Sequence, residues 1–320
     1  MSADQAVGRA EGRPFRFGAQ ASKADDGAAW ADLARRLEDD GFDTMSMPDH
    51  LGPQLAPLSA LGYASAGTTT LRFTMSVLDN DFRHPAILAK ELATLDVLSD
   101  GRLEIGIGAG WMRADYDGTG IPYDPPAVRI DRMVEAIRII KALLASGPAE
   151  LEGDHYQVTG VEGFPKPVQQ PHPPILIGGG GRRMLSVAAR EADIVGINGT
   201  LTAGAIGPDV LGSMRAAAVD ERIPWIRDAA DDRFDDIELN VRAFFVSVTN
   251  DREGVASNLA TALGFDVEEI LSTPFALIGS PQQLVDDLCE RRDRWGFSYV
   301  IVGAEDTDAF APVVAELTGR

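Results

Sequence analysis

LRFTMSVLDNDFRHPAILAKELATLDVLSDGRLEIGIGAGW, residues 71–111, contains one complete strand–helix–strand unit. Its apolar run at 71–77 predicts a strand, and apolar residues at helical spacing over 85–99 predict a helix that opens on a proline and ends at Asp100-Gly101. A second apolar run at 103–107 predicts the next strand. The unit is therefore typical of proteins in which parallel strands alternate with helices.

The same alternation continues on both sides of this unit. We expect strands at 15–19, 44–47, 71–77, 103–107, 175–177, 194–197, 238–248 and 299–302. We expect helices at 27–40, from Pro57, and at 85–99, 127–145, 182–191, 251–275 and 281–295. Two irregular excursions, 150–174 and 199–236, interrupt the pattern.

Eight strands separated by helices favour a (β/α)8 TIM barrel over a doubly wound open sheet. The fold class is therefore α/β, with insertions on the C-terminal face of the barrel. One barrel domain covers residues 15–320, and residues 1–14, which are small and polar, are expected to form a flexible N-terminal tail.

Composition excludes several classes of protein. The 320 residues carry 29 Lys and Arg against 49 Asp and Glu, a net charge of −20, which disfavours nucleic acid and anionic membranes as partners. No apolar run reaches the roughly 20 residues of a membrane helix, and the acidic start lacks the pattern of a secretion signal. A single cysteine, Cys289, cannot form an internal disulfide. These features favour a cytoplasmic protein that acts on a small molecule.

Asp49 and His50 directly follow the predicted strand 44–47 and so belong on the catalytic rim of a barrel. Histidine exchanges protons near neutral pH, and an adjacent carboxylate can orient it. A helix cap and a loop hydrogen bond explain the pair equally well. The four histidines form no His-x-His pair, so we expect no metal site.

Two glycine-rich segments follow predicted strands. Gly178–Gly181 with Arg182 and Arg183 lies between a strand and a helix, an arrangement that suits a phosphate or serves as a tight turn. Gly106–Gly110 allows a flat ligand to approach, or packs at a strand end. Trp111 and Tyr116 come next and line a substrate pocket or pack against a neighbouring loop.

Four stretches together resemble the bacterial luciferase-like monooxygenase superfamily, especially its coenzyme F420-dependent branch. They are Pro48-Asp49-His50, the segment 76–111, the PPILI-plus-glycine run ending at 181, and IGSPQQLVDDL at 278–288. The resemblance implies a barrel that binds a flavin or deazaflavin across the strand ends. Ser76, Val77 and Leu78 would back the ring, often through an irregular or cis peptide in relatives. The residues along the cofactor would be Asp79, Gly108, Ala109 and Gly110, and those at its phosphate Gly179, Gly180, Gly181 and Arg182.

The resemblance implies an F420-dependent oxidoreductase that transfers a hydride between the deazaflavin and a small organic substrate. His50 would be the proton partner, and Asp49 its orienter or a cofactor contact. Relatives commonly form homodimers through the helices after the second and third strands. Trp111 stands where sugar-phosphate dehydrogenases of this branch carry an acid, which argues against glucose 6-phosphate as substrate.

Three alternatives remain open at this point. The first is an FMN-dependent two-component monooxygenase, and the second is a barrel that binds a cofactor without catalysis, because the catalytic acid is missing. A metal-dependent hydrolase comes last. The compact length and the Asp49-His50 pair favour F420 over FMN.

Overall fold

A closed ring of parallel strands forms the centre of the molecule. The computed structural model describes residues 12–201 and 204–320, so the predicted tail falls almost entirely outside them. The ring strands are β1 (Arg16–Gln20), β2 (Thr44–Met47), β3 (Arg72–Met75), β5 (Leu103–Gly108), β8 (Ile175–Gly179), β9 (Ile194–Ile197), β10 (Glu238–Arg242) and β13 (Phe297–Gly303). They pair in that order, and β13 pairs back with β1. The predicted (β/α)8 barrel is confirmed.

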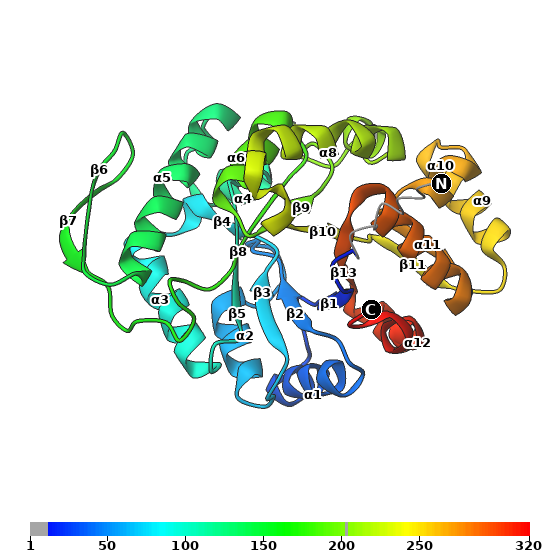
Figure 1. Cartoon of the computed structure of the whole chain (residues 1–320), viewed down its shortest axis with the longest axis horizontal. Coiled ribbons are helices and arrows are strands. Elements are labelled where there is room, and N and C mark those ends of the chain that lie inside the picture. The colour runs from blue at the N-terminus through cyan, green and yellow to red at the C-terminus, as the bar shows by residue number, and fades with distance from the viewer. Residues whose placement is uncertain (1–11, 202–203) are drawn as a thin grey trace, which may run out of the picture.

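Helices surround these strands (Figure 1). They are α1 (Gly27–Asp39), α2 (Pro57–Ser65), α3 (Pro85–Leu98), α4 (Arg113–Thr119), α5 (Pro126–Leu144), α6 (Arg182–Glu191), α7 (Pro208–Gly212), α8 (Ala216–Ala230), α9 (Arg252–Leu263), α10 (Val267–Ser272), α11 (Pro281–Trp295) and α12 (Thr307–Leu317). Short 3-10 turns η1 (Asn80–Phe82), η2 (Asp231–Asp236) and η3 (Ala304–Asp306) join some of them. Along α1, Trp30, Ala34 and Leu37 form one buried stripe, as the sequence spacing predicts.

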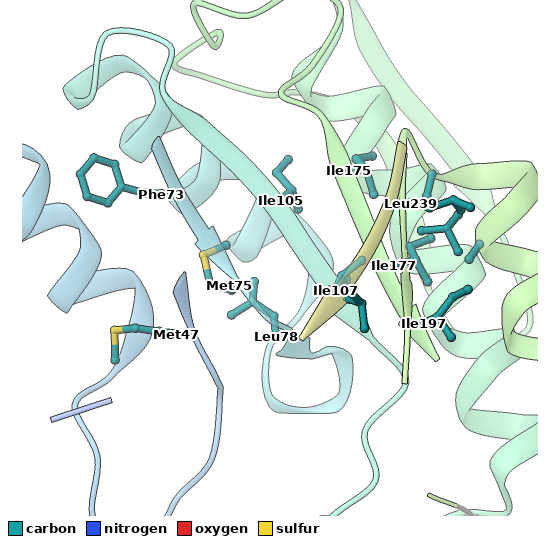
Figure 2. Close-up of a cluster of buried hydrophobic side chains, with 14 of the residues drawn as sticks. Met47, Phe73, Met75, Leu78, Ile105, Ile107, Ile175, Ile177, Ile197 and Leu239 are labelled. Atoms are coloured by element: carbon teal, nitrogen blue, oxygen red, sulfur yellow. The ribbon is translucent and has the colours of Figure 1, made fainter. Parts of the chain in front are cut away.

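The outer faces of the ring strands pack against the helices. Figure 2 shows apolar side chains from β2, β3, β5, β8, β9 and β10 gathered in this layer. Side chains alternate between the two faces of β5. Leu103, Ile105 and Ile107 belong to the large apolar cluster, whereas Glu104 points to the other face and pairs with Arg16. Complete burial of one such aliphatic side chain stabilises the fold by about 1.5–3 kcal/mol.

The interior of the barrel is partly polar. Near the strand starts, the Arg16 guanidinium binds the Glu104 carboxylate at 2.6 Å and the Glu238 carboxylate at 2.6 Å. These groups come from β1, β5 and β10, so the ion pairs link strands across the barrel. This end of the barrel is thus filled with side chains, and the opposite end is left to form a site.

The predicted long strand 238–248 is wrong. Its first half is β10, but β11 (Phe245–Val248) leaves the ring and pairs with β12 (Ala276–Gly279), a strand that the sequence reading missed. The partner changes at Phe244, whose N–H donates to the Phe275 carbonyl after the Ala243 N–H has donated to Ile301. Because apolar residues continue on both sides of this change of partner, the sequence pattern does not reveal it.

The excursion 150–174 does not build the C-terminal face. Its first part belongs to an antiparallel hairpin of β6 (Pro148–Glu152) and β7 (Gln157–Glu162), which begins two residues earlier and lies outside α5 (Figure 1). The Glu135 carboxylate of α5 accepts hydrogen bonds from the N–H groups of Asp154, His155 and Tyr156 and so anchors the hairpin turn. The excursion connects a helix to the start of a strand, so its ends belong to the N-terminal side of the barrel.

Among residues 12–201 and 204–320, no helix is long and apolar enough to span a membrane. Within the same residues, no group of three or more His, Cys, Asp or Glu side chains has the arrangement of a metal site.

Candidate active site

A cavity of about 460 Å³ opens at the carboxyl ends of the ring strands. Its volume lies in the range of small-molecule sites, and barrels place their sites at this face. The predicted site residues on its wall are Asp49, His50, Ser76, Val77, Leu78, Asp79, Gly108, Ala109, Gly110, Trp111, Gly179, Gly180, Gly181 and Arg182. The fold thus brings these residues together, while their individual roles stay predictions.

His50 is held by a carboxylate that the sequence reading missed. The Nδ1 atom of His50 lies 2.8 Å from Oδ2 of Asp115, which comes from α4. The other oxygen of Asp115 accepts a hydrogen bond from the Leu51 N–H at 3.2 Å. The Trp111 ring stands nearly perpendicular to the imidazole, with ring centres 5.6 Å apart. The arrangement fixes the histidine at the cavity wall.

Of the two roles predicted for Asp49, orientation of His50 is wrong, and contact with the cofactor stays a prediction. The buried Asp49 carboxylate instead forms a bidentate ion pair with Arg83, at 2.5 and 3.1 Å. It also accepts a hydrogen bond from the Asp79 N–H at 3.1 Å. These two neighbours in sequence thus contact different partners, Arg83 and Asp115.

The backbone after β3 forms one wall of the cavity. The Ser76–Val77 peptide is cis, the geometry that the resemblance implies. Gly108 must be a glycine here, since a Cβ atom would lie 2.6 Å from Val77. At Gly110 a Cβ atom would lie 1.8 Å from the Tyr116 hydroxyl, and φ is +74°. The glycines of this motif therefore allow close packing of the protein itself.

The predicted place of Tyr116 in the pocket is wrong. Its side chain is completely buried and is absent from the cavity wall. Its hydroxyl lies 3.1 Å from both oxygens of Asp79 and 3.1 Å from Asp81. Burial, followed by the nearby Asp81 charge, raises the pKa of Asp79 to about 6 despite hydrogen bonds that favour the charged form. Tyr116 thus supports Asp79 from behind the wall.

The glycine run at the end of β8 has two distinct parts. At Gly180 a Cβ atom would lie 2.4 Å from the Gly199 carbonyl oxygen, so this glycine lets two backbone segments approach. At Gly181 a Cβ atom would meet nothing within 4 Å. Gly181 is the N-cap of α6, and the first N–H groups of a helix have no partner within it. The open space at Gly181 therefore suits an anion.

A second residue missed by the sequence reading, Arg222 of α8, stands behind this run. Its Nε atom donates to the Gly180 carbonyl at 2.9 Å and its Nη2 atom to the Thr200 hydroxyl at 3.2 Å. Its Nη1 atom is buried and has no hydrogen-bond partner in the described part of the chain. Burial lowers the pKa of this guanidinium. A positive charge without a paired carboxylate favours an anion nearby.

These features fit the phosphate-bearing end of a flavin or deazaflavin. The open cradle at Gly181, the start of α6 and the buried charge of Arg222 all favour an anion at one end of the cavity. The other end carries an apolar wall around Val77 and the proton-exchanging group of His50. A ligand with a flat ring and an anionic tail would match both ends.

Comparison with known proteins identifies a family and two kinds of relative. A family model described as luciferase-like monooxygenase matches residues 13–299. The chain is 31% identical over 228 residues to an F420-dependent glucose-6-phosphate dehydrogenase from Microbacterium testaceum, a match that covers 68% of this chain and 66% of that protein. It is 32% identical over 139 residues to an FMNH(2)-dependent dimethylsulfone monooxygenase from Pseudomonas putida, which covers 43% of this chain and 38% of that protein. The chain thus spans less than two thirds of the length of both relatives.

Solved structures share the fold. The coenzyme F420-dependent tetrahydromethanopterin reductase from Methanopyrus kandleri superposes with a TM-score of 0.76 at 21% identity, over 95% of this chain and 98% of that one. An F420-dependent secondary alcohol dehydrogenase, solved with an F420-acetone adduct, gives a TM-score of 0.75 at 19% identity. It covers 95% of this chain and 98% of that one. At these identities the likeness establishes the architecture of the barrel.

Proposed function

The chain belongs to the luciferase-like monooxygenase family, and from that premise we propose that it is an F420-dependent oxidoreductase. It would transfer a hydride between the deazaflavin and a small organic substrate. The observation that carries this proposal is the pair of His50 and Asp115 at the wall of a cavity whose far end suits an anion.

The pair supplies a proton-exchanging group. A carboxylate that faces Nδ1 keeps a proton on that nitrogen, so Nε2 of His50 is left to accept or donate a proton. Asp115 also stabilises the imidazolium that forms when Nε2 takes up a proton. Trp111 packs against the imidazole ring and helps to hold it in place. His50 is thus the catalytic residue of the proposal, and Asp115 positions it.

The proposed cofactor would be held by the two ends of the cavity. Ser76, Val77 and Leu78 would back its ring, and Gly181 with Arg182 would bind its phosphate. When bound, the deazaflavin would supply a ring carbon that accepts or donates a hydride, a hydrogen together with its two bonding electrons. Arg222 would stabilise the phosphate through its charge from behind the glycine run.

An FMN-dependent two-component monooxygenase is the alternative, and the dimethylsulfone monooxygenase relative supports it. A barrel without catalysis is the second alternative. The reason for this alternative was the lack of an acid directly after the β5 glycines. Asp115 places a carboxylate at His50 and so weakens that reason.

One titration tests the proposal. F420 and FMN are added separately to the purified protein, and fluorescence quenching gives both dissociation constants under the same conditions. If the protein uses F420, we expect F420 to bind at least about tenfold more tightly than FMN, a difference of about 1.4 kcal/mol in binding free energy. A preference for FMN would replace the proposal by the monooxygenase alternative. Binding of neither would leave only the fold.

We also propose a homodimer that forms through α2 and α3. Tyr63 of α2 and Ile87 and Leu98 of α3 are exposed by 56%, 60% and 67%. Exposed apolar side chains on neighbouring helices favour a protein partner. Light scattering on the purified protein and on Ile87→Asp tests this proposal, since an aspartate would disfavour the contact. Residues 15–320 as one domain and a cytoplasmic location complete the proposed description.

A further inference from the structure

Arg242 occupies a distinct position among the inward-facing residues of β10. Glu238 pairs with Arg16 near the strand starts, and the Asn240 amide donates to the Tyr299 carbonyl at 3.1 Å. Two residues further along, on the same face of the strand, Arg242 reaches the wall of the cavity. The alternation of side chains along β10 thus places the Arg242 guanidinium inside the barrel, near the carboxyl ends of the strands.

The guanidinium has neutral partners only. Its Nε atom donates to the Gln20 side-chain oxygen, and its Nη1 atom donates to the Ala243 carbonyl at 2.8 Å. Over residues 12–201 and 204–320, no carboxylate lies within 4.0 Å of it, and Nη2 has no hydrogen-bond partner. Glu305 and Asp306 act on it only from a longer range. Burial lowers the pKa of Arg242, which indicates a positive charge that the protein compensates poorly.

This charge is separate from the anion cradle at the glycine run. Gln20 of β1, which contacts Arg242, also donates to the Ser76 carbonyl at 3.4 Å. Arg242 is therefore linked to the wall that the proposed ring would face. Arg222 and Gly181 instead belong to the segments around β8 and α8. Arg242 and the anion cradle around Gly181 therefore belong to different parts of the cavity wall.

We propose that Arg242 binds the carboxylate of an organic-acid substrate and thereby selects acids over neutral analogues of the same shape. The proposal rests on the proposed function, because it assigns the substrate class of the same cavity. Nη2 has no hydrogen-bond partner among the described residues, and the planar guanidinium presents parallel donors that match the two oxygens of a carboxylate. One guanidinium balances one negative charge, and the nearby Glu305 and Asp306 disfavour a dianion such as a phosphate ester.

The test compares a carboxylate with the neutral amide of the same shape and with a phosphate ester that carries the same phenyl ring. Phenylacetate, phenylacetamide and phenyl phosphate are titrated into the protein by calorimetry, with and without saturating F420. We expect phenylacetate to bind at least about tenfold more tightly than the amide, the gain typical of a charge-assisted hydrogen bond. Equal affinity for acid and amide overturns the proposal. Tighter binding of phenyl phosphate in the F420-saturated protein, where the anion cradle is filled, overturns the assignment to a carboxylate.

Variants of Arg242 test whether this residue causes the preference for the acid over the amide. Arg242→Gln is expected to bring the acid down to the affinity of the amide and to leave amide binding unchanged. Arg190→Gln, at an exposed position in the last turn of α6, makes the same change in net charge and is expected to keep the preference. Arg242→Lys keeps the charge without the fork of donors and is expected to reduce the preference at least about threefold. An unchanged acid-to-amide ratio in the folded Arg242 variants overturns the proposal.

Separate readouts keep the two proposals distinguishable. F420 quenching on the same samples reports cofactor binding independently of the acid. Loss of acid preference in Arg242→Gln with no F420 binding in any sample would support this site and reject the F420 proposal. Tight F420 binding without acid preference would reject this site alone. Circular dichroism of each variant confirms its fold.

Discussion

Gly181→Val is expected to weaken binding of F420 by about a hundredfold while the protein stays folded. A Cβ atom at Gly181 meets no atom within 4 Å, and its φ of −89° and ψ of 150° are open to valine. The new side chain would fill the space in front of the first N–H groups of α6. Loss of two hydrogen bonds to a charged group, at about 1.5 kcal/mol each, amounts to about 3 kcal/mol or a hundredfold. Exchange of glycine for valine at the N-cap costs about 1 kcal/mol of unfolding free energy.

Gly180→Ala is the matched comparison. Its Cβ atom would lie 2.4 Å from the Gly199 carbonyl oxygen and 2.6 Å from that of Asn198, so the variant is expected to lose about 2 kcal/mol or more of unfolding free energy. Fluorescence quenching measures F420 affinity, and urea denaturation measures stability. Wild-type F420 affinity in folded Gly181→Val would refute the reasoning and move the anionic end of the cofactor elsewhere.

The remaining predictions concern the proton pair, Asp79 and Arg222. His50→Ala is expected to lower the rate of F420H2 oxidation by a panel of carbonyl compounds at least about a hundredfold and to leave F420 affinity unchanged; an unaltered rate removes His50 from the mechanism. Asp115→Asn is expected to lower that rate by about tenfold or more, because the amide no longer stabilises a protonated His50; equal rates in variant and wild type would make the contact structural only. The pKa of Asp79 is raised to about 6 in the folded protein, so its contribution to stability is present below pH 4 and is lost as pH rises through 6. The free energy of unfolding, measured by denaturation from pH 4 to pH 7, should therefore fall by roughly 2–3 kcal/mol more in wild type than in Asp79→Asn. The same pH dependence in both proteins would contradict this. Arg222→Met is expected to weaken F420 binding about tenfold by removing a buried charge, with FMN as the second probe of the same phosphate site; retained affinity for both would assign Arg222 to the fold alone.

Local patterns were sufficient for most secondary structure. Prolines at helix starts and apolar residues at helical spacing placed α3 and α11 closely, and short apolar runs placed β2 and β9. These elements form because each carries its own capping and burial pattern. The region after β10 was different. Strands β11 and β12 pair outside the ring, and an apolar run alone does not reveal a change of partner.

The motifs located the cavity but not the contacts within it. Asp49 stands beside His50 in sequence, yet the partner of His50 is Asp115, 65 positions away. Arg222 carries no motif, since one arginine in an amphipathic helix is ordinarily exposed. A search for acids in the segment after the β5 glycines, beyond the first position, could have found Asp115. No signal in the sequence marks Arg222.

The sequence by itself determined the barrel, the resemblance to a family, and the strand ends that carry the site. It did so because helix and strand periodicity, capping and glycine spacing act over a few residues and are legible in one chain segment. Closure of the ring decided the rest. It brought α4 to His50, α8 behind the glycine run and Arg242 to the cavity. Such contacts depend on where separate elements meet in space, and side-chain burial and charge compensation are set only there.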